Sequence, residues 1–107
     1  MQGRVWHERE SFAGRDLRQA TLDGHHYKMC DFSGANLRGA SLRGTSFSFC
    51  DLRRADLRGA DLTDATFGRV LTHDPSGGRT DVTGACFEGA ILRRTAFDAV
   101  LGWPGAD

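Results

Sequence analysis

Two short groups of residues combine side chains that bind metal ions in proteins. His25 and His26 lie shortly before Cys30, and His73 is followed by Asp74. A closed zinc site needs about four such ligands converging on one point. Neighbouring residues of an extended segment point to opposite sides, so His25 and His26 diverge, and the His73–Asp74 pair lacks further ligands. The sequence therefore predicts no metal site and no cofactor.

The cysteines are candidate nucleophiles or disulfide partners. Cys30 and Cys50 are twenty residues apart, and we expect them to be reduced and to lie in the interior as small apolar side chains. Cys86 falls at an outward position, but no neighbour that would activate its thiol is evident. Three cysteines without a disulfide-like arrangement favour a reducing compartment. The charged N-terminal residues also lack the apolar segment of a signal peptide, so we expect a cytoplasmic protein.

Composition and motifs argue against an enzyme. The chain contains no phosphate-binding loop, nucleophile elbow or dinucleotide fingerprint. Its 107 residues predict a single domain. The formal net charge is zero, from 14 basic and 14 acidic residues. This balance argues against a membrane surface or nucleic acid as a bulk electrostatic partner.

Large apolar side chains recur at every fifth residue, each preceded two residues earlier by a residue that is mostly small. In the unit Ala35-Asn36-Leu37-Arg38-Gly39, Ala35 and Leu37 share one side of an extended edge, and a polar corner follows. A period of five fits neither an α-helix nor a flat strand, so it predicts a coil with its own repeat. The predicted core consists of the large residues of this series: Phe12, Leu17, Leu22, Tyr27, Phe32, Leu37, Leu42, Phe47, Leu52, Leu57, Leu62, Phe67, Val82, Phe87, Leu92 and Phe97.

A second period of twenty residues indicates four edges in each turn of the coil. Tyr27, Phe47, Phe67 and Phe87 are each twenty residues apart, so four edges per turn would stack these rings on one wall. Neighbouring coils would then be about 4.8 Å apart. The sequence thus predicts an all-β, four-sided parallel β-helix of four to five coils.

The units ADLRG (55–59), ANLRG (35–39), ADLTD (60–64) and CDFSG (30–34) closely resemble the pentapeptide-repeat proteins, whose motif is A(D/N)LXX. The resemblance covers residues 10–67 and 80–99. It implies the right-handed quadrilateral β-helix of that family. Some family members mimic duplex DNA, bind DNA gyrase or topoisomerase IV and protect against quinolones, so the resemblance also implies this activity as an alternative function.

Residues 68–81 lack the motif. Pro75, Gly77 and Gly78 indicate a turn, yet the spacing from Phe67 to Phe87 is still twenty. We interpret this segment, centred on residues 70–79, as replacing about two edges of one coil and bulging outward. It is either a solvated turn without a role or a recognition loop that presents His73 and Asp74 to a partner.

Arginines follow the same twenty-residue period and are the candidate partner-binding residues. The outward column consists of Arg18, Arg38 and Arg58. A parallel column on the same face consists of Asp16, Asn36 and Asp56. The adjacent edge carries Arg53 and Arg54, followed two coils further on by Arg93 and Arg94. These charges either form solvated pairs that contribute little, or a basic stripe that binds an acidic partner or phosphates.

The ends of a stack of coils expose apolar residues and unpaired edges. Within a single domain of residues 1–107, we expect residues 1–9 to form an N-terminal cap with Trp6. Residues 10–99 would form the repeats, and residues 100–107 a C-terminal cap with Trp103. The alternative is that one end is the interface of a homodimer.

A packed rod without a pocket favours a non-catalytic protein-interaction module. We expect it to bind a partner protein through one face or through the 70–79 loop. Mimicry of DNA requires a strongly negative surface, whereas this neutral chain carries 13 arginines. Binding to nucleic acid is not expected either, because no exposed aromatic residues interleave with the arginines.

Overall fold

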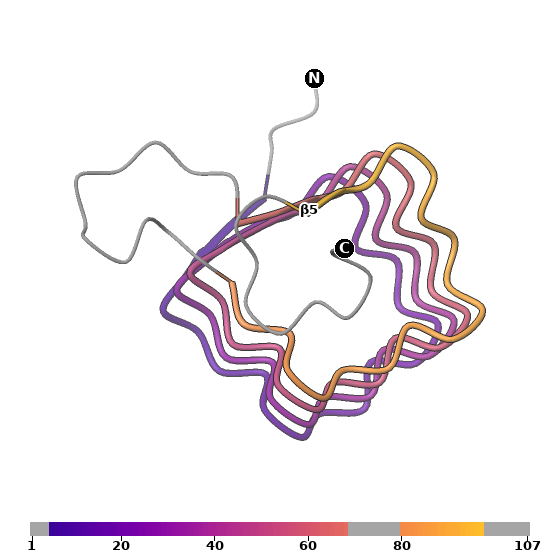
Figure 1. Ribbon diagram of the computed structural model, residues 1–107. Coiled ribbons are helices and arrows are strands. Elements are labelled where there is room, and N and C mark those ends of the chain that lie inside the picture. Colours follow the sequence, from indigo (N-terminus) through magenta and orange to yellow (C-terminus); the bar gives the residue numbers. More distant parts are fainter. Residues whose placement is uncertain (1–4, 69–79, 98–107) are drawn as a thin grey trace.

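Four short edges repeat in every turn of a coil whose outline is square when viewed along its axis (Figure 1). The computed structural model describes residues 5–68 and 80–97. One side is a parallel five-stranded sheet in the order β1-β2-β3-β4-β5. Its strands are β1 (Trp6–Glu8), β2 (His26–Lys28), β3 (Ser46–Ser48), β4 (Thr66–Phe67) and β5 (Ala96–Phe97).

The other three sides are held together by isolated parallel bridges. We call them the first, second and third faces in chain order. The first face contains the bridge Asp31↔Asp51, the second Asn36↔Asp56 and the third Ser41↔Asp61. The predicted class, an all-β right-handed β-helix with four sides, is confirmed. In the described part of the chain no helix is long and apolar enough to cross a membrane.

Each edge is extended for only two or three residues because a corner follows. The amide of Ala35 donates to the carbonyl of Phe32 at 3.0 Å, and the amide of Ala40 donates to that of Leu37 at 3.1 Å. The third residue of such a turn has a positive φ, which is 68° at Gly39. Glycine adopts this conformation without steric cost, which explains its frequency at the fifth position of the repeat.

The interior is a continuous column of apolar side chains. Residues of the small series are as completely enclosed as the large ones, with Ala40 and Leu42 both 0 % exposed. All of the predicted large core residues lie in the buried cluster or pack against it; those that pack against it, at the outer levels, are Phe12, Leu17, Leu22, Phe87, Leu92 and Phe97. Small residues are required because two large side chains at each edge would exceed the width of the tube.

Aromatic rings stack along the inner side of the sheet. The ring centroids of His7 and Tyr27 are 4.7 Å apart, those of Tyr27 and Phe47 are 5.2 Å apart, and those of Phe47 and Phe67 are 4.9 Å apart. Phe97 continues the stack at 4.9 Å from Phe67, with an interplanar angle of 10°. Such pairs contribute roughly 0.5–1.5 kcal/mol each beyond the burial of their area.

The prediction that Phe87 continues this stack is wrong. Its neighbour Cys86 bridges to Asp56, so Phe87 lies on the second face, and its ring meets that of Phe67 edge-on at 6.3 Å. The cause is a change in the length of the coil. Asp31 pairs with Asp51, twenty residues later, whereas Asp51 pairs with Asp81, thirty residues later.

The interruption therefore adds ten residues and does not replace two edges. Thr80 re-enters the coil directly, because its hydroxyl donates to the carbonyl of Phe47 at 2.7 Å and accepts from the amide of Cys50 at 3.2 Å. The placement of Arg93 and Arg94 two coils beyond Arg53 is also wrong. The amide of Asp64 donates to the carbonyl of Arg93, which places both arginines on the third face.

The predicted N-terminal cap is not observed at Trp6. This residue lies on the outer side of β1, where it stacks on His26 at 4.4 Å and is 68 % exposed. His7 occupies the inward position of β1, so the coil already begins within the segment expected to cap it. Residues 70–79, His73, Asp74 and Trp103 lie outside the described residues.

Deleting residues 70–79 restores the twenty-residue coil. We expect the variant to unfold cooperatively, with a midpoint within a few degrees of the wild type, because no described edge is removed. The matched control deletes residues 40–49, which are also ten residues but include β3 and an edge of the third face. Circular dichroism melts compare the unfolding midpoint and the cooperativity of the two deletion variants. Loss of cooperative unfolding in the first variant would show that residues 70–79 complete the coil.

Truncation of a core side chain should lower the free energy of unfolding more in the middle coils than in the end coil. Leu62 is 0 % exposed, so Leu62→Ala is expected to lower the free energy of unfolding by about 3 kcal/mol. Leu22 lies on the same face at the outermost level and is only partly buried, so Leu22→Ala should lower it by less. Urea unfolding of the two variants tests this order. Equal losses would contradict a closed column of coils.

Candidate functional site

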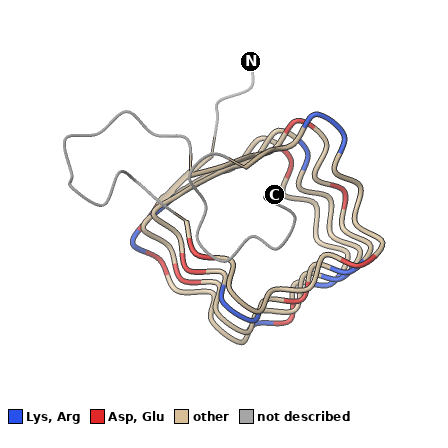
Figure 2. Ribbon diagram, viewed as in Figure 1, with Lys and Arg blue, Asp and Glu red and all other residues tan. Residues whose placement is uncertain are grey.

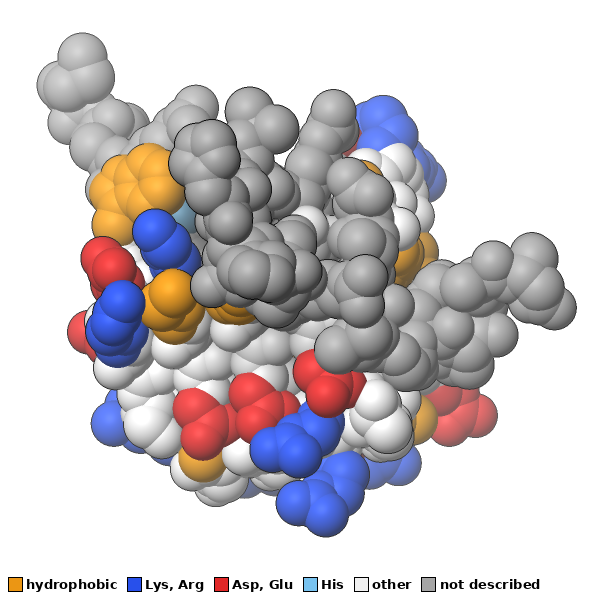
Figure 3. Space-filling model, turned by 60° about the vertical axis from the view of Figure 1, so that its left-hand side comes forward, with side chains coloured by type: hydrophobic (Ala, Val, Ile, Leu, Met, Phe, Trp, Pro, Cys, Tyr) orange, Lys and Arg blue, Asp and Glu red, His pale blue; other side chains and the backbone are white. Residues whose placement is uncertain are grey.

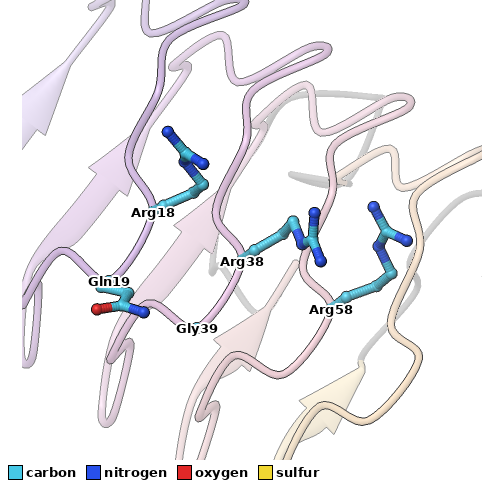
Figure 4. A pocket seen from close by; sticks show the side chains of 5 residues that line it. All are labelled: Arg18, Gln19, Arg38, Gly39 and Arg58. Atoms are coloured by element: carbon cyan, nitrogen blue, oxygen red, sulfur yellow. The ribbon is translucent and has the colours of Figure 1, made fainter.

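Three arginines lie one above another at the corner that follows the second face. The amide of Gln19 donates to the carbonyl of Arg38, and the amide of Gly39 donates to that of Arg58, both at 3.0 Å. These hydrogen bonds place Arg18, Arg38 and Arg58 on successive coils, as Figure 4 shows. The predicted column is thus assembled by the backbone register, and not by contacts among the side chains.

The column lines a shallow groove of about 370 Å³ together with Gln19 and Gly39 (Figure 4). Gly39 presents no side chain to the groove, and a Cβ atom at this position would contact Cγ of Gln19 at 3.4 Å. A second depression of about 340 Å³ is lined by Asp16, Arg18 and Gln19. The groove is an open surface feature with guanidinium groups along it.

Two of the three arginines are held by carboxylates of their own edge. Nε and Nη2 of Arg18 donate to the two oxygens of Asp16, both at 2.8 Å. Arg58 donates to Asp56 in the same way, at 2.9 and 2.7 Å. The side-chain hydrogen bond from Arg18 lowers the pKa of Asp16 to about 2. The pKa of Asp56 is lowered by the same interaction with Arg58.

Arg38 differs because Asn36 stands where the other two edges carry aspartate. Oδ1 of Asn36 accepts the backbone amide of Arg38 at 3.2 Å, just as Asp16 accepts that of Arg18. A neutral amide offers a single acceptor oxygen and no charge. Within the described residues, the guanidinium of Arg38 has no hydrogen bond or ion pair. The positive charge of Arg38 also helps to lower the pKa of Asp56.

The other predicted arginines lie at different corners. Arg53 forms the same two-bond pair with Asp51 at 2.9 and 2.8 Å, but it follows the first face. Arg54 occupies the corner beside Gly84. The structure therefore does not bring Arg53 and Arg54 into the groove formed by Arg18, Arg38 and Arg58.

The histidines diverge as predicted. Nδ1 of His25 lies 3.1 Å from Nε2 of His7 and 3.4 Å from the hydroxyl of Tyr27. His26 faces outward, with Nδ1 2.7 Å from Oγ of Ser46. Burial, followed by the neighbouring His7, lowers the pKa of His25. Among the described residues, no three His, Cys, Asp or Glu side chains are grouped to hold a metal ion.

Sequence reasoning missed the polar group that ends the aromatic stack. Nδ1 of His7 lies 2.5 Å from a carboxylate oxygen of Glu10, and its ring stacks on Tyr27. The signal was present in the sequence, because His7 precedes Phe12 by five residues and so occupies the inward register.

The described cysteines are free thiols. Cys30 and Cys50 are buried and Cys86 is partly exposed. Burial raises the pKa of Cys50, which disfavours the reactive thiolate form.

Comparison with known proteins identifies the repeat. A family model for pentapeptide repeats matches residues 30–69 with eight copies. No curated protein sequence matches the chain significantly.

Solved structures of pentapeptide-repeat proteins share the fold. One from the thylakoid lumen of Arabidopsis thaliana is 29 % identical over 87 % of this chain, with a TM-score of 0.69. The match covers 60 % of that protein, so this chain spans less than two thirds of its length. Another, from Nostoc PCC 7120, is 24 % identical over 99 % of this chain and 93 % of its own, with a TM-score of 0.59. QnrB1, a plasmid-mediated fluoroquinolone resistance protein, is 20 % identical over 90 % of this chain and 72 % of its own, with a TM-score of only 0.41.

The family model and the similarity of fold agree with the motif, the square coil and the twenty-residue register described above. The chain contains pentapeptide repeats and folds as pentapeptide-repeat proteins do.

Proposed function

We propose that this chain is a non-catalytic protein-interaction module that binds a partner protein through its second face. The observation that carries the proposal is the arginine groove, in which three guanidinium groups face only two carboxylates. Exposed salt bridges contribute little to stability, so the column is not needed to hold the coil together. A surface with fixed charges on a rigid scaffold is suited to recognition.

The described interior supports a binding role over catalysis. Apolar side chains fill the tube, and no buried side-chain nitrogen or oxygen among the described residues lacks a hydrogen-bond partner. An active site requires converging polar groups in a pocket. The two grooves at the arginine corner are open to solvent. The carboxylate that lines the second of them, that of Asp16, is already paired with Arg18.

Mimicry of DNA against gyrase or topoisomerase IV is less well supported. It needs a continuous negative surface. On the first face, Asp31, Asp51 and Asp81 follow one another, but Arg53 pairs with the middle one. Acidic and basic residues also lie close together along the ribbon of Figure 2, and their side chains lie side by side on the face shown in Figure 3. We expect no inhibition of supercoiling by gyrase at micromolar protein, and clear inhibition there would favour the mimic instead.

Neutralising the groove should abolish capture of the partner. In affinity capture from the native lysate, followed by mass spectrometry, the variant R18Q/R38Q/R58Q is expected to lose specific proteins that the wild type retains. The control R53Q/R94Q changes two arginines at other corners and should retain them. Both variants should melt like the wild type, because the altered pairs are exposed. Equal capture by all three proteins would exclude the second face as the binding surface.

A further inference from the structure

We propose that the arginine groove is a site for a single doubly charged oxyanion of the phosphate class, presented by the partner as a phosphorylated side chain. This inference rests on the proposed function and names the chemical group that the second face recognises. Its centre is Arg38, and its ligand contacts come from Arg38 together with a neighbouring arginine.

The charges in the groove are locally unbalanced. The groove contains Arg18, Arg38 and Arg58, and two of them are matched by Asp16 and Asp56. The positive charge of the third is uncompensated because Asn36 replaces the expected carboxylate. An anion bound there offsets this charge without breaking either existing pair.

The arginines of the groove also retain unused hydrogen-bond donors. Each guanidinium carries five N–H groups. Arg18 and Arg58 use Nε and Nη2 for their carboxylates, which leaves Nη1 in each. Arg38 keeps its complete guanidinium for a ligand, because Asn36 engages only its backbone amide. A planar guanidinium binds phosphate oxygens through two parallel hydrogen bonds.

The spacing of the arginines and the access to them also suit a single anion. Successive coils are separated by about 4.8 Å, so one tetrahedral anion can reach Arg38 and the arginine of an adjacent coil. Gly39 has no side chain to obstruct the approach, and Gln19 lines the same groove. Glu88 lies on the next coil, where its carbonyl accepts the amide of Gly59 and its charge acts on Arg58.

These features favour a phosphate monoester over a carboxylate. A carboxylate is satisfied by one guanidinium, whereas a phosphate has additional oxygen atoms that can also accept from Nη1 of a neighbouring arginine. The flanking carboxylates of Asp16 and Asp56 limit the site to one anion. The same groove would therefore bind a phosphorylated peptide more tightly than an acidic one.

The test compares Asn36→Asp with the wild type. This nearly isosteric change supplies the missing carboxylate and should pair it with Arg38, as in the two neighbouring coils. Titrations with inorganic phosphate, at constant ionic strength, are followed by ¹H–¹⁵N NMR of the arginine Nε–H groups and the amide of Gly39. We expect saturable shifts in the wild type and at least tenfold weaker binding in N36D and in R38Q. The control R94Q removes an arginine paired with Asp64 on the third face and should bind like the wild type.

Peptides distinguish the source of the anion. A phosphoserine peptide should bind more tightly than free phosphate. The same peptide with serine or glutamate in place of phosphoserine should bind at least tenfold more weakly than the phosphopeptide. Absence of shifts in the wild type, or equal binding by N36D, would overturn the phosphate site. If partner capture were still lost in R18Q/R38Q/R58Q, the interaction module itself would stand, with a different contacting group. Binding of free phosphate without any preference for the phosphopeptide would refute the peptide-borne source.

Discussion

Hydrogen bonds between the backbones of successive coils set the position of every other feature in this molecule. The amide of Leu37 donates to the carbonyl of Asp56 at 2.7 Å, and the amide of Asn36 donates to that of Arg15 at 2.9 Å. Because each edge is bonded to the edges on either side, corresponding residues of neighbouring coils lie over one another. The aromatic stack inside and the arginine column outside are both consequences of this register. No strand exceeds three residues among those described. The coil is therefore held together by many short paired edges and not by long strands.

The local rules of this fold could be predicted from the sequence, whereas its phase across the interruption could not. The five-residue period determines which side chains face inward, and Leu42, Leu57 and Leu62 are completely buried as expected. A ten-residue insertion is a multiple of five, so it leaves this alternation intact while it moves every later residue by two sides of the square. The spacing from Phe67 to Phe87 therefore looked undisturbed, although the true partner of Phe67 is Phe97. The twenty-residue and thirty-residue registers differ only in which distant edges pair with each other. A single sequence does not contain this information.

Part of the candidate site could also be predicted from residue spacing, whereas the rest required the three-dimensional structure. The twenty-residue recurrence of Arg18, Arg38 and Arg58 predicted the column, since all three precede the interruption. The sequence shows Asn36 where the neighbouring coils have aspartate. Its consequence for Arg38 becomes clear only from the structure, in which Asp16 and Asp56 each pair with the arginine of their own edge. Arg53 was predicted on the adjacent edge, and its pairing with Asp51 on the first face agrees with that placement. The proposed interaction surface thus depends on one uncharged side chain, Asn36, between two aspartates.

The register across the interruption is tested most directly by NMR scalar couplings through hydrogen bonds. They connect a donor amide nitrogen to the carbonyl carbon of its acceptor and so identify each pair of edges. The structure predicts a coupling from the amide of Leu52 to the carbonyl of Asp81, and one from Leu62 to Ile91, where the donor–acceptor distances are both 2.8 Å. A coupling from Leu52 to the carbonyl of Leu71 would instead show that the twenty-residue coil continues unbroken. That result would contradict the assignment of every residue beyond the interruption.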